Sequence, residues 1–352
     1  MRQVVILGSP DTKRMIYLKK AAEQEGLPVT IVEWKSWAEQ NCLPNAEALF
    51  VKIDPPLWSS CSLEELNRLA DTYIQQLQNL DCLARTQEII FLNTPSAITE
   101  LLDKRTCKAK LQRAGICVTE AMQIPVSSDT GTCTVELLFE EMRKQRVYQV
   151  FIKPVKGSGA AGVSALRWQL QTGQMALYTC ALLQDDSSFV NTKRLRRFSK
   201  TEEIIPLLNR ILELGCIVER WYTKTEYQGY SYDLRAVVQD GQLDFLLARL
   251  SKGPITNLHL NNHPVDVATL GLPKHTFEEI TQLCRESMAL YPGLRSAGID
   301  ILLEKGSIRP RIIEMNAQGD LIYQDIYHEN KIYRRQVQMM KEWLQKMKRD
   351  CS

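Results

Sequence analysis

The hydrophobic pattern of this chain changes near residue 100. Before that point, short apolar runs alternate with a helical pattern, in the order QVVILGSP, TKRMIYLKKAAEQEG and PVTIVEW. After it, strand-like runs follow one another through turns that contain glycine, as in YDLRAVVQDGQLDFLLARL and IDILLEKGSIRPRIIEMN. Strands separated by helices pair in parallel, whereas strands joined by tight turns pair antiparallel. The pattern therefore predicts a mixed α/β (α+β) chain, with a parallel unit first and antiparallel units after it.

The length of 352 residues exceeds that of one ordinary domain. We divide the chain into an α/β domain over 1–103, a unit over 104–215 that contains the segment KPVKGSGAAG, and a unit over 216–352 that contains the late strand pairs. The turn at Gly8 lacks the GxGxxG spacing of a dinucleotide site. The glycine-rich segment lies between two strands, whereas a P-loop leads from a strand into a helix. Both of these nucleotide-binding motifs are therefore excluded.

Composition excludes several classes of partner. A net charge of +3 is too small to indicate nucleic-acid binding. No apolar run approaches the ~20 residues of a membrane span, and the short apolar stretch at the start does not resemble a signal peptide. The ten cysteines are scattered without a CxxC pair, which favours reduced thiols and a cytoplasmic location. We interpret the basic run KRLRRFSK at 193–200 as a solvated loop or sheet edge; contact with an acidic substrate is the weaker alternative.

The strand IRPRIIEMN carries two oxygen-bearing side chains. Side chains alternate along a strand, so Glu314 and Asn316 share one face while Ile313 and Met315 point to the other. Asp300 is a similar lone carboxylate in the apolar run AGIDILLE. Two carboxylates and one amide oxygen suit a hard ion such as Mg2+, which also binds substrate phosphates.

A structural explanation stays open for each of these residues. Glu314 would cap a turn or pair with Arg309 or Arg311, and Asn316 would open the turn NAQGD. The metal interpretation therefore depends on a phosphate site elsewhere in the chain.

The glycine-rich segment is the candidate phosphate site. Glycines let backbone N–H groups approach phosphate oxygens, and lysines add positive charge. The candidate residues are Lys153, Lys156, Gly157, Ser158 and Gly159. Simple turn chemistry is the alternative for this segment. Lys104 begins a helix upstream, and Glu219 ends an apolar strand downstream, with Glu226 seven residues later.

Taken in order, these motifs resemble the ATP-grasp carboxylate–amine ligases. The matching segments are DKRTCKAKLQRAGI, FIKPVKGSGAAGV, VERWY, YDLRAVV, TNLHL, GIDIL and IIEMNA. The resemblance is closest to the branch that adds glutamate to a ribosomal protein tail and to the ligases that crosslink ribosomal peptides. It implies an ATP-grasp fold, in which two antiparallel subdomains clamp ATP behind an N-terminal α/β domain. It also implies ATP and Mg2+ as cofactors, and it leaves a homo-oligomer open because members are often dimeric or larger.

The resemblance assigns a role to each matching residue. Lys104 and Lys153 resemble the two nucleotide lysines, and the loop 156–162 resembles the flexible lid over the phosphates. The hinge that reads adenine corresponds to Glu219, the Arg220 carbonyl and the Tyr222 amide. Glu226 corresponds to the carboxylate that binds ribose, and Asp233 to a carboxylate that faces the nucleotide. Asn257 belongs to the loop that approaches the phosphates. The metal ligands correspond to Asp300, Glu314 and Asn316.

The chain departs from this branch at two places. Ile255 stands where an arginine is usual, so we expect Arg249 or Lys252 to meet the charge of the transition state. After the residues NA, members of this branch often continue with Pro-Gly, whereas this chain continues with Gln318, Gly319 and Asp320. Both changes lie where the substrate or the γ-phosphate would bind.

The resemblance implies that a substrate carboxylate attacks the γ-phosphate of ATP and that an amine captures the acylphosphate. An amino acid or a peptide is the expected substrate, and an amide or ester product stays open. Two alternatives remain, a nucleotide-regulated binding protein without turnover and an ATP-grasp kinase. Retention of three metal ligands favours catalysis over binding alone. We interpret His259 as a structural loop residue rather than a group near the acceptor.

Overall fold

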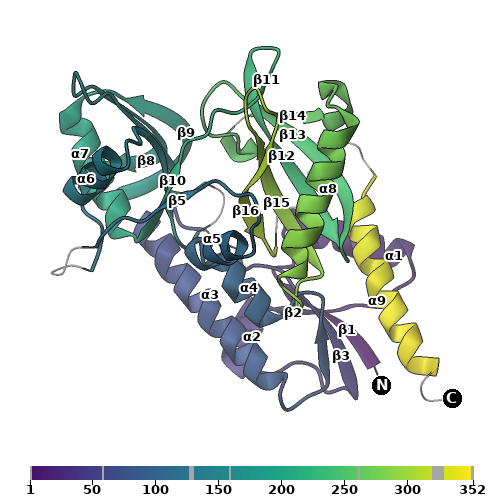
Figure 1. The fold of residues 1–352 in the computed structure, drawn as a ribbon. Helices are drawn as coiled ribbons and strands as arrows, with labels where there is room; N and C mark the ends of the chain where they lie inside the picture. The colour runs from purple at the N-terminus through teal and green to yellow at the C-terminus, as the bar shows by residue number, and fades with distance from the viewer. Residues whose placement is uncertain are drawn as a thin grey trace.

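The computed structural model describes residues 2–57, 59–126, 131–157, 160–260, 262–318 and 329–349. In these ranges the strands form three sheets, and Figure 1 shows helices packed beside each sheet. The nine cysteines of the described ranges are free thiols. None of the described helices is long and apolar enough to cross a membrane.

The first sheet is parallel, as the strand–helix alternation predicts. Its strand order is β2-β1-β3-β4, and every neighbouring pair is parallel. The strands and connecting helices are β1 (Arg2–Gly8), α1 (Lys13–Gln24), β2 (Thr30–Glu33), α2 (Trp34–Gln40), β3 (Ala48–Ile53), α3 (Leu63–Leu83) and β4 (Ile89–Phe91). The hydroxyls of Thr12 and Ser62 accept hydrogen bonds from the first turns of α1 and α3, which fixes where each helix begins.

The second sheet is antiparallel and contains the glycine-rich hairpin. Its strand order is β5-β10-β6-β7-β8-β9, and helices α6 (Val135–Lys144) and α7 (Thr201–Glu213) accompany it. The strands are β5 (Ala121–Met122), β6 (Gln149–Pro154), β7 (Ser164–Trp168), β8 (Met175–Leu183), β9 (Phe189–Phe198) and β10 (Cys216–Arg220). Strands β6 and β7 pair antiparallel, as predicted for a hairpin. Most of the basic run 193–200 lies on β9, an edge strand, in agreement with the sheet-edge interpretation.

The third sheet holds the late strand pairs. Its order is β14-β13-β12-β15-β16, with β11 paired to β12. The elements are β11 (Glu226–Tyr227), β12 (Tyr230–Gln239), β13 (Gln242–Ser251), η1 (Leu258–Leu260), β14 (His263–Asp266), η2 (Val267–Leu270), α8 (Lys274–Ala289), β15 (Ser296–Leu303) and β16 (Pro310–Asn316). Asp240 and Gly241 connect β12 and β13 with φ values of 46° and 73°. Two central residues with positive φ form the tight hairpin turn that suits twisted strands.

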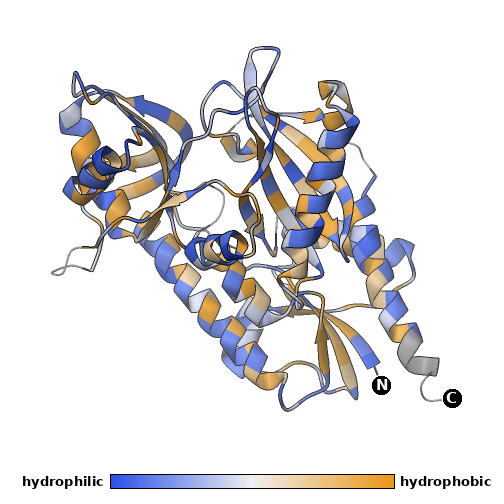
Figure 2. Cartoon of the chain, viewed as in Figure 1, coloured by the Kyte–Doolittle hydropathy of each residue, from blue (hydrophilic) through white to orange (hydrophobic). Residues whose placement is uncertain are grey.

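Two hydrophobic clusters join the first and third sheets. In one, Val51 of β3 belongs to the same core as Leu234 of β12 and Ile299 of β15. On the other side of the first sheet, α1 packs with α9 (Lys331–Arg349), as Figure 1 shows. The second sheet has its own core, formed mainly with α6 and α7. Figure 2 shows hydrophobic and hydrophilic residues alternating along helices such as α3 and α9, as expected for helices with one buried face.

Two short helices connect the first sheet to the second. They are α4 (Pro95–Leu102) and α5 (Lys104–Arg113). The carboxylate of Asp103 accepts a hydrogen bond of 2.8 Å from the Thr106 N–H and so caps α5. Lys104 is therefore the first residue of its helix, as the sequence predicts.

The backbone at Gly162 requires glycine for two reasons. Its φ is +68°, and a Cβ atom there would lie 2.8 Å from Cγ of Pro154. We predict that Gly162→Ala lowers the free energy of unfolding by roughly 2–5 kcal/mol, because the left-handed conformation costs roughly 1–2 kcal/mol and overpacking adds about 1–3 kcal/mol. Gly173 has a similar φ of +71° with no atom within 4 Å of the added Cβ, so Gly173→Ala should show the conformational cost alone. Urea denaturation measures both losses, and equal losses would contradict the steric argument.

Candidate active site

One face of the third sheet carries a row of charged side chains. On β12, Asp233 and Arg235 alternate with buried apolar residues, as expected for a strand with one core face. The strand register places Asp233 opposite Arg249, Arg235 opposite Asp300, and Asp300 opposite Glu314. The row therefore crosses β13, β12, β15 and β16.

A β-bulge interrupts strand β16 beside this row. Asp300 pairs with Glu314, but the next residue of β15 pairs with Ile312, so Ile313 is the extra residue. Met315 is buried in the core, while Glu314 and Asn316 line a cavity. Strict alternation predicts that Ile313 faces away from them, but the bulge brings Ile313 to the cavity as well.

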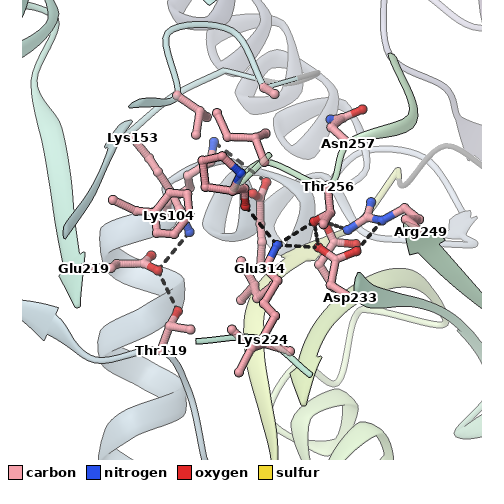
Figure 3. Close-up of a pocket in the computed structure, with 18 of the residues that line it drawn as sticks. Lys104, Thr119, Lys153, Glu219, Lys224, Asp233, Arg249, Thr256, Asn257 and Glu314 are labelled. Carbon is pink, nitrogen blue, oxygen red and sulfur yellow. Dashed lines mark hydrogen bonds and ion pairs between the residues drawn. The ribbon is translucent and has the colours of Figure 1, made fainter. Parts of the chain in front are cut away.

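A second charged group comes from the second sheet. Oε2 of Glu219 accepts hydrogen bonds from Lys153 Nζ at 2.8 Å and from the Thr119 hydroxyl at 2.6 Å (Figure 3). Oε1 of Glu219 lies 3.3 Å from Lys108 Nζ. Burial opposes ionisation of Glu219, but the two ammonium groups and these hydrogen bonds outweigh burial and lower its pKa. Burial lowers the pKa of Lys108, and the Glu219 carboxylate opposes this effect.

Lys104 connects the glycine-rich hairpin to the bulged strand. Its Nζ donates a hydrogen bond of 2.7 Å to the carbonyl of Gly157 and lies 3.8 Å from Oε1 of Glu314. Its side chain is only 10% exposed. Lys104 therefore lies where a bound anion would meet both segments.

Asp233 is the centre of a third charged group, labelled in Figure 3. Its Oδ1 accepts a hydrogen bond of 2.7 Å from Nε of Arg249, and its Oδ2 accepts one from the Thr256 hydroxyl. Nζ of Lys224 donates to the Thr256 oxygen at 2.7 Å and lies 3.6 Å from Oδ2 of Asp233. Burial opposes ionisation of Asp233, but Arg249 and Lys224 lower its pKa overall. Burial lowers the pKa of Lys224.

Two guanidinium groups also contact Asp300. Nε of Arg235 lies 2.9 Å from its Oδ1, and Nη2 of Arg249 lies 3.2 Å from its Oδ2. Arg249 therefore bridges two carboxylates, Asp233 and Asp300.

The charged row of the third sheet, the Glu219 group and the Asp233 group surround one cavity that is open to solvent. Most of the predicted site residues line it. They are Lys104, Lys153, Gly157, Glu219, Arg220, Tyr222, Asp233, Arg249, Asn257, Asp300, Glu314 and Asn316. The structure thus brings together residues that are up to 212 positions apart in the sequence, from Lys104 to Asn316.

Three predicted residues are absent from the described lining of this cavity. Lys156 forms an ion pair with Asp71 of α3. The ammonium of Lys252 lies over the ring of a β12 tyrosine, 5.4 Å from its centroid. Glu226 is exposed and pairs with Lys305 at 2.8 Å. Their assigned roles stay predictions.

Other predictions fall outside the described residues. Ser158 and Gly159 belong to the glycine-rich loop, and Asp320 follows β16. The side chain of His259 is likewise not described.

The cavity also contains residues that the sequence patterns did not single out. They are Thr119, Lys224, Arg235 and Thr256. Arg235 follows Asp233 by two positions on a strand, so the alternation of side chains was a usable signal. Lys108, which contacts Glu219 behind the cavity, follows Lys104 by one helical turn and was detectable in the same way. Lys224 is a single lysine in an irregular segment, and no periodic pattern indicates it.

The residues at β15 and β16 fit one kind of metal ion. Within the described ranges, no group of three or more His, Cys, Asp or Glu side chains is arranged to hold a metal. Asp300 and Glu314 offer two carboxylates, and Asn316 offers an amide oxygen on the same strand pair. Mg2+ is usually bound by one or two carboxylates and completes its shell with water and phosphate oxygens. This donor set therefore suits Mg2+ beside a nucleotide.

We predict that Glu219→Gln lowers the free energy of unfolding by about 3–5 kcal/mol at pH 7, because it leaves two buried lysines without their counter-ion. A carboxyl whose pKa falls on folding stabilises the fold above its unfolded pKa of 4.5, and this contribution disappears as the pH drops through the lower folded pKa. The difference between wild type and variant should therefore narrow below about pH 4.5.

Chemical denaturation between pH 3.5 and 7 checks this prediction. The exposed Glu213 pairs with Arg210, so Glu213→Gln is a matched control and should change stability by about 0.5 kcal/mol or less. A stability difference for Glu219→Gln that does not vary with pH would contradict the assigned charge of Glu219.

No family model and no curated protein matches this chain by sequence. Its structure resembles three solved enzymes. The D-cycloserine synthetase DcsG has a TM-score of 0.61 and 13% identity, covering 97% of this chain and 99% of that one. The macrocyclase MdnC of Microcystis aeruginosa, bound with the precursor peptide MdnA, has a TM-score of 0.59 and 13% identity. That match covers 97% of this chain and 100% of MdnC.

The third is the ATP-grasp ligase PsnB, complexed with a phosphomimetic variant of its minimal precursor, Mg and ADP. Its TM-score is 0.51 and its identity 14%, covering 90% of this chain and 89% of that one. All three matches extend over nearly the whole length of both chains, including the parallel first sheet and the two antiparallel sheets. The fold prediction is confirmed: this chain has the ATP-grasp fold.

Proposed function

We propose that this protein is an ATP- and Mg2+-dependent ligase that activates a carboxylate as an acylphosphate and joins it to an amine. The observation that carries the proposal is the single cavity in which Lys104 and Lys153 face Asp300, Glu314 and Asn316. Phosphoryl transfer requires positioning and charge neutralisation rather than a protein nucleophile. The similar fold of DcsG, MdnC and PsnB, which are a synthetase, a macrocyclase and a ligase, supports the same reaction class.

In this proposal the second sheet holds the nucleotide. Lys104 and Lys153 bind the α- and β-phosphates, and the loop 156–162 closes over them. The backbone of Arg220 and Tyr222 at the end of β10 reads the adenine edge. The carboxylate of Glu219 is engaged by lysines, so its main contribution is to hold Lys153 in place.

The third sheet then holds the metal and the reacting phosphate. Asp300, Glu314 and Asn316 would hold Mg2+, which neutralises charge on the β- and γ-phosphates when bound. Arg249 lines the cavity, so it is a better candidate than Lys252 to stabilise the transferring phosphoryl group. Asn257 would contribute from the loop before η1.

The chemistry proceeds in two displacements. A carboxylate oxygen of the substrate attacks the γ-phosphorus, the bond to the β-phosphate oxygen breaks, and ADP leaves. The amine then attacks the acyl carbon, phosphate leaves, and the amine loses a proton. An amino acid or peptide substrate is part of the proposal, supported by the precursor peptides bound to MdnC and PsnB. The proposal also includes a division of the chain into three units, over 1–103, 104–215 and 216–352. It further includes a cytoplasmic location.

A nucleotide-binding protein without turnover is the second candidate. The contacts of Asp300 with Arg235 and Arg249 favour it, because a metal ion must compete with these guanidiniums for the same carboxylate. Ile255 in place of the usual arginine points the same way. ADP production distinguishes the two candidates.

Nucleotide binding is the first test. We predict that Lys153→Ala weakens ADP binding roughly 10- to 100-fold, since a hydrogen bond to a charged group contributes about 1.5–3 kcal/mol. Calorimetric titration measures the affinity, and Lys144→Ala on the exposed side of α6 is the control. Unchanged affinity in Lys153→Ala would remove Lys153 from the phosphate site.

Turnover is the second test. Glu314→Gln removes one negative charge with little change in shape, so the thermal midpoint should stay within a few degrees of wild type. We predict that ADP production with pooled amino acids or peptides falls roughly 100-fold or more, because a bound metal supplies several kcal/mol of charge stabilisation. Glu304→Gln is the control, since Glu304 pairs with Arg311 outside the cavity. Retained turnover with lower stability would overturn the metal assignment.

A further inference from the structure

Lys108 occupies a buried position between the second and third sheets. It lies one helical turn after Lys104 on α5 and is 4% exposed. It is absent from the described lining of the cavity, so a bound nucleotide would contact its neighbours rather than Lys108 itself. A buried ammonium is costly unless several acceptors surround it.

The ammonium of Lys108 has acceptors on both sides. Toward the second sheet, it donates to the Thr119 hydroxyl oxygen at 2.8 Å and lies 3.3 Å from Oε1 of Glu219. The same Glu219 carboxylate holds Lys153. Lys108 therefore contacts the group that positions a proposed phosphate lysine.

Toward the third sheet, Lys108 contacts the bulge of β16. Its Nζ donates to the carbonyl of Ile313 at 2.7 Å and lies 3.4 Å from that of Ile312. Ile313 is the extra residue of the bulge and directly precedes Glu314. An ammonium has three N–H donors, which are enough to serve Thr119, Glu219 and Ile313 together.

We propose that Lys108 is a positioning residue that aligns the phosphate lysine Lys153 with the metal-binding residue Glu314. It holds Lys153 through Glu219 and holds Glu314 through the Ile313 carbonyl. This inference rests on the proposed function, since it assigns the two aligned groups to a nucleotide and its metal. Residues that orient the ligands of a metal site typically change affinity or activity 10- to 100-fold when they are replaced.

The test uses ADP affinity measured by calorimetry with Mg2+ and with EDTA. Lys108→Met keeps an unbranched side chain, one atom shorter than lysine, and removes its three donors. We expect ADP affinity in EDTA to fall roughly 10-fold, because Lys153 loses its alignment. We also expect the increase in affinity that Mg2+ produces in wild type to shrink, because Glu314 loses its alignment. A purely structural role would lower the thermal midpoint and leave both quantities unchanged in the folded fraction.

Thr119→Val is a second variant that separates the two connections. It removes the hydroxyl that bonds both Lys108 and Glu219, and so weakens the connection to Glu219, while the direct 3.3 Å ion pair of Lys108 with Glu219 and its contact with the Ile313 carbonyl stay in place. It should weaken ADP binding in EDTA but keep the Mg2+ effect. If Lys108→Met does not fold, this variant alone decides the inference, and unchanged ADP affinity would overturn it.

Lys110→Met is the matched control on the same helix. Lys110 is part-exposed, pairs with Glu100 at 2.8 Å and does not contact Glu219 or β16 in the described structure. It should bind ADP as wild type does. Wild-type protein that fails to bind ADP would overturn the proposed function and this inference together. If wild-type protein binds ADP and Lys108→Met shows the same ADP affinity and the same Mg2+ effect as wild type, the inference alone is overturned.

Discussion

The candidate site depends on pairing buried charges. Asp233, Arg249 and Glu219 are each about 2% exposed, and a charge in such a position is costly without an opposite charge beside it. The partners come from different strands, helices and loops, as with Lys153 of β6 and Lys108 of α5 on Glu219. A shift of one residue in any of these strands would point a charge into the hydrophobic core. The charge pairs therefore specify the register of the strands that form the cavity.

Local patterns in the sequence predict a large part of this arrangement. The strand period places Glu314 and Asn316 on one face, and the Asp103 cap places Lys104 at the start of its helix. The sequence does not predict the bulge at Ile313, because a bulge depends on how two strands pair. It also does not predict that Glu219 accepts from Thr119, which lies 100 positions earlier. Such contacts arise from tertiary packing rather than local propensity.

The cores indicate which part of the molecule is free to move. The first and third sheets share a continuous hydrophobic cluster, so relative motion between them would disrupt close packing. The second sheet has its own core, which includes Leu63 at the start of α3, and it meets the third sheet at smaller contacts, such as Leu195 of β9 against Gly253. Opening of the cavity is therefore expected to move the second sheet as a unit, while the proposed metal-binding residues stay with the first and third sheets.

The packing of α9 has a consequence for how the protein is made. Tyr333, Val337 and Trp343 of α9 complete the core against Val4 and Phe50 of the first sheet. During synthesis at roughly 5–20 residues per second, the strands that carry Val4 and Phe50 leave the ribosome roughly 15–60 seconds before α9 does. Through that interval their apolar side chains lack part of their native cover. The first sheet is thus translated well before its core is complete, and a chaperone that shields apolar strands would find a target there during this interval.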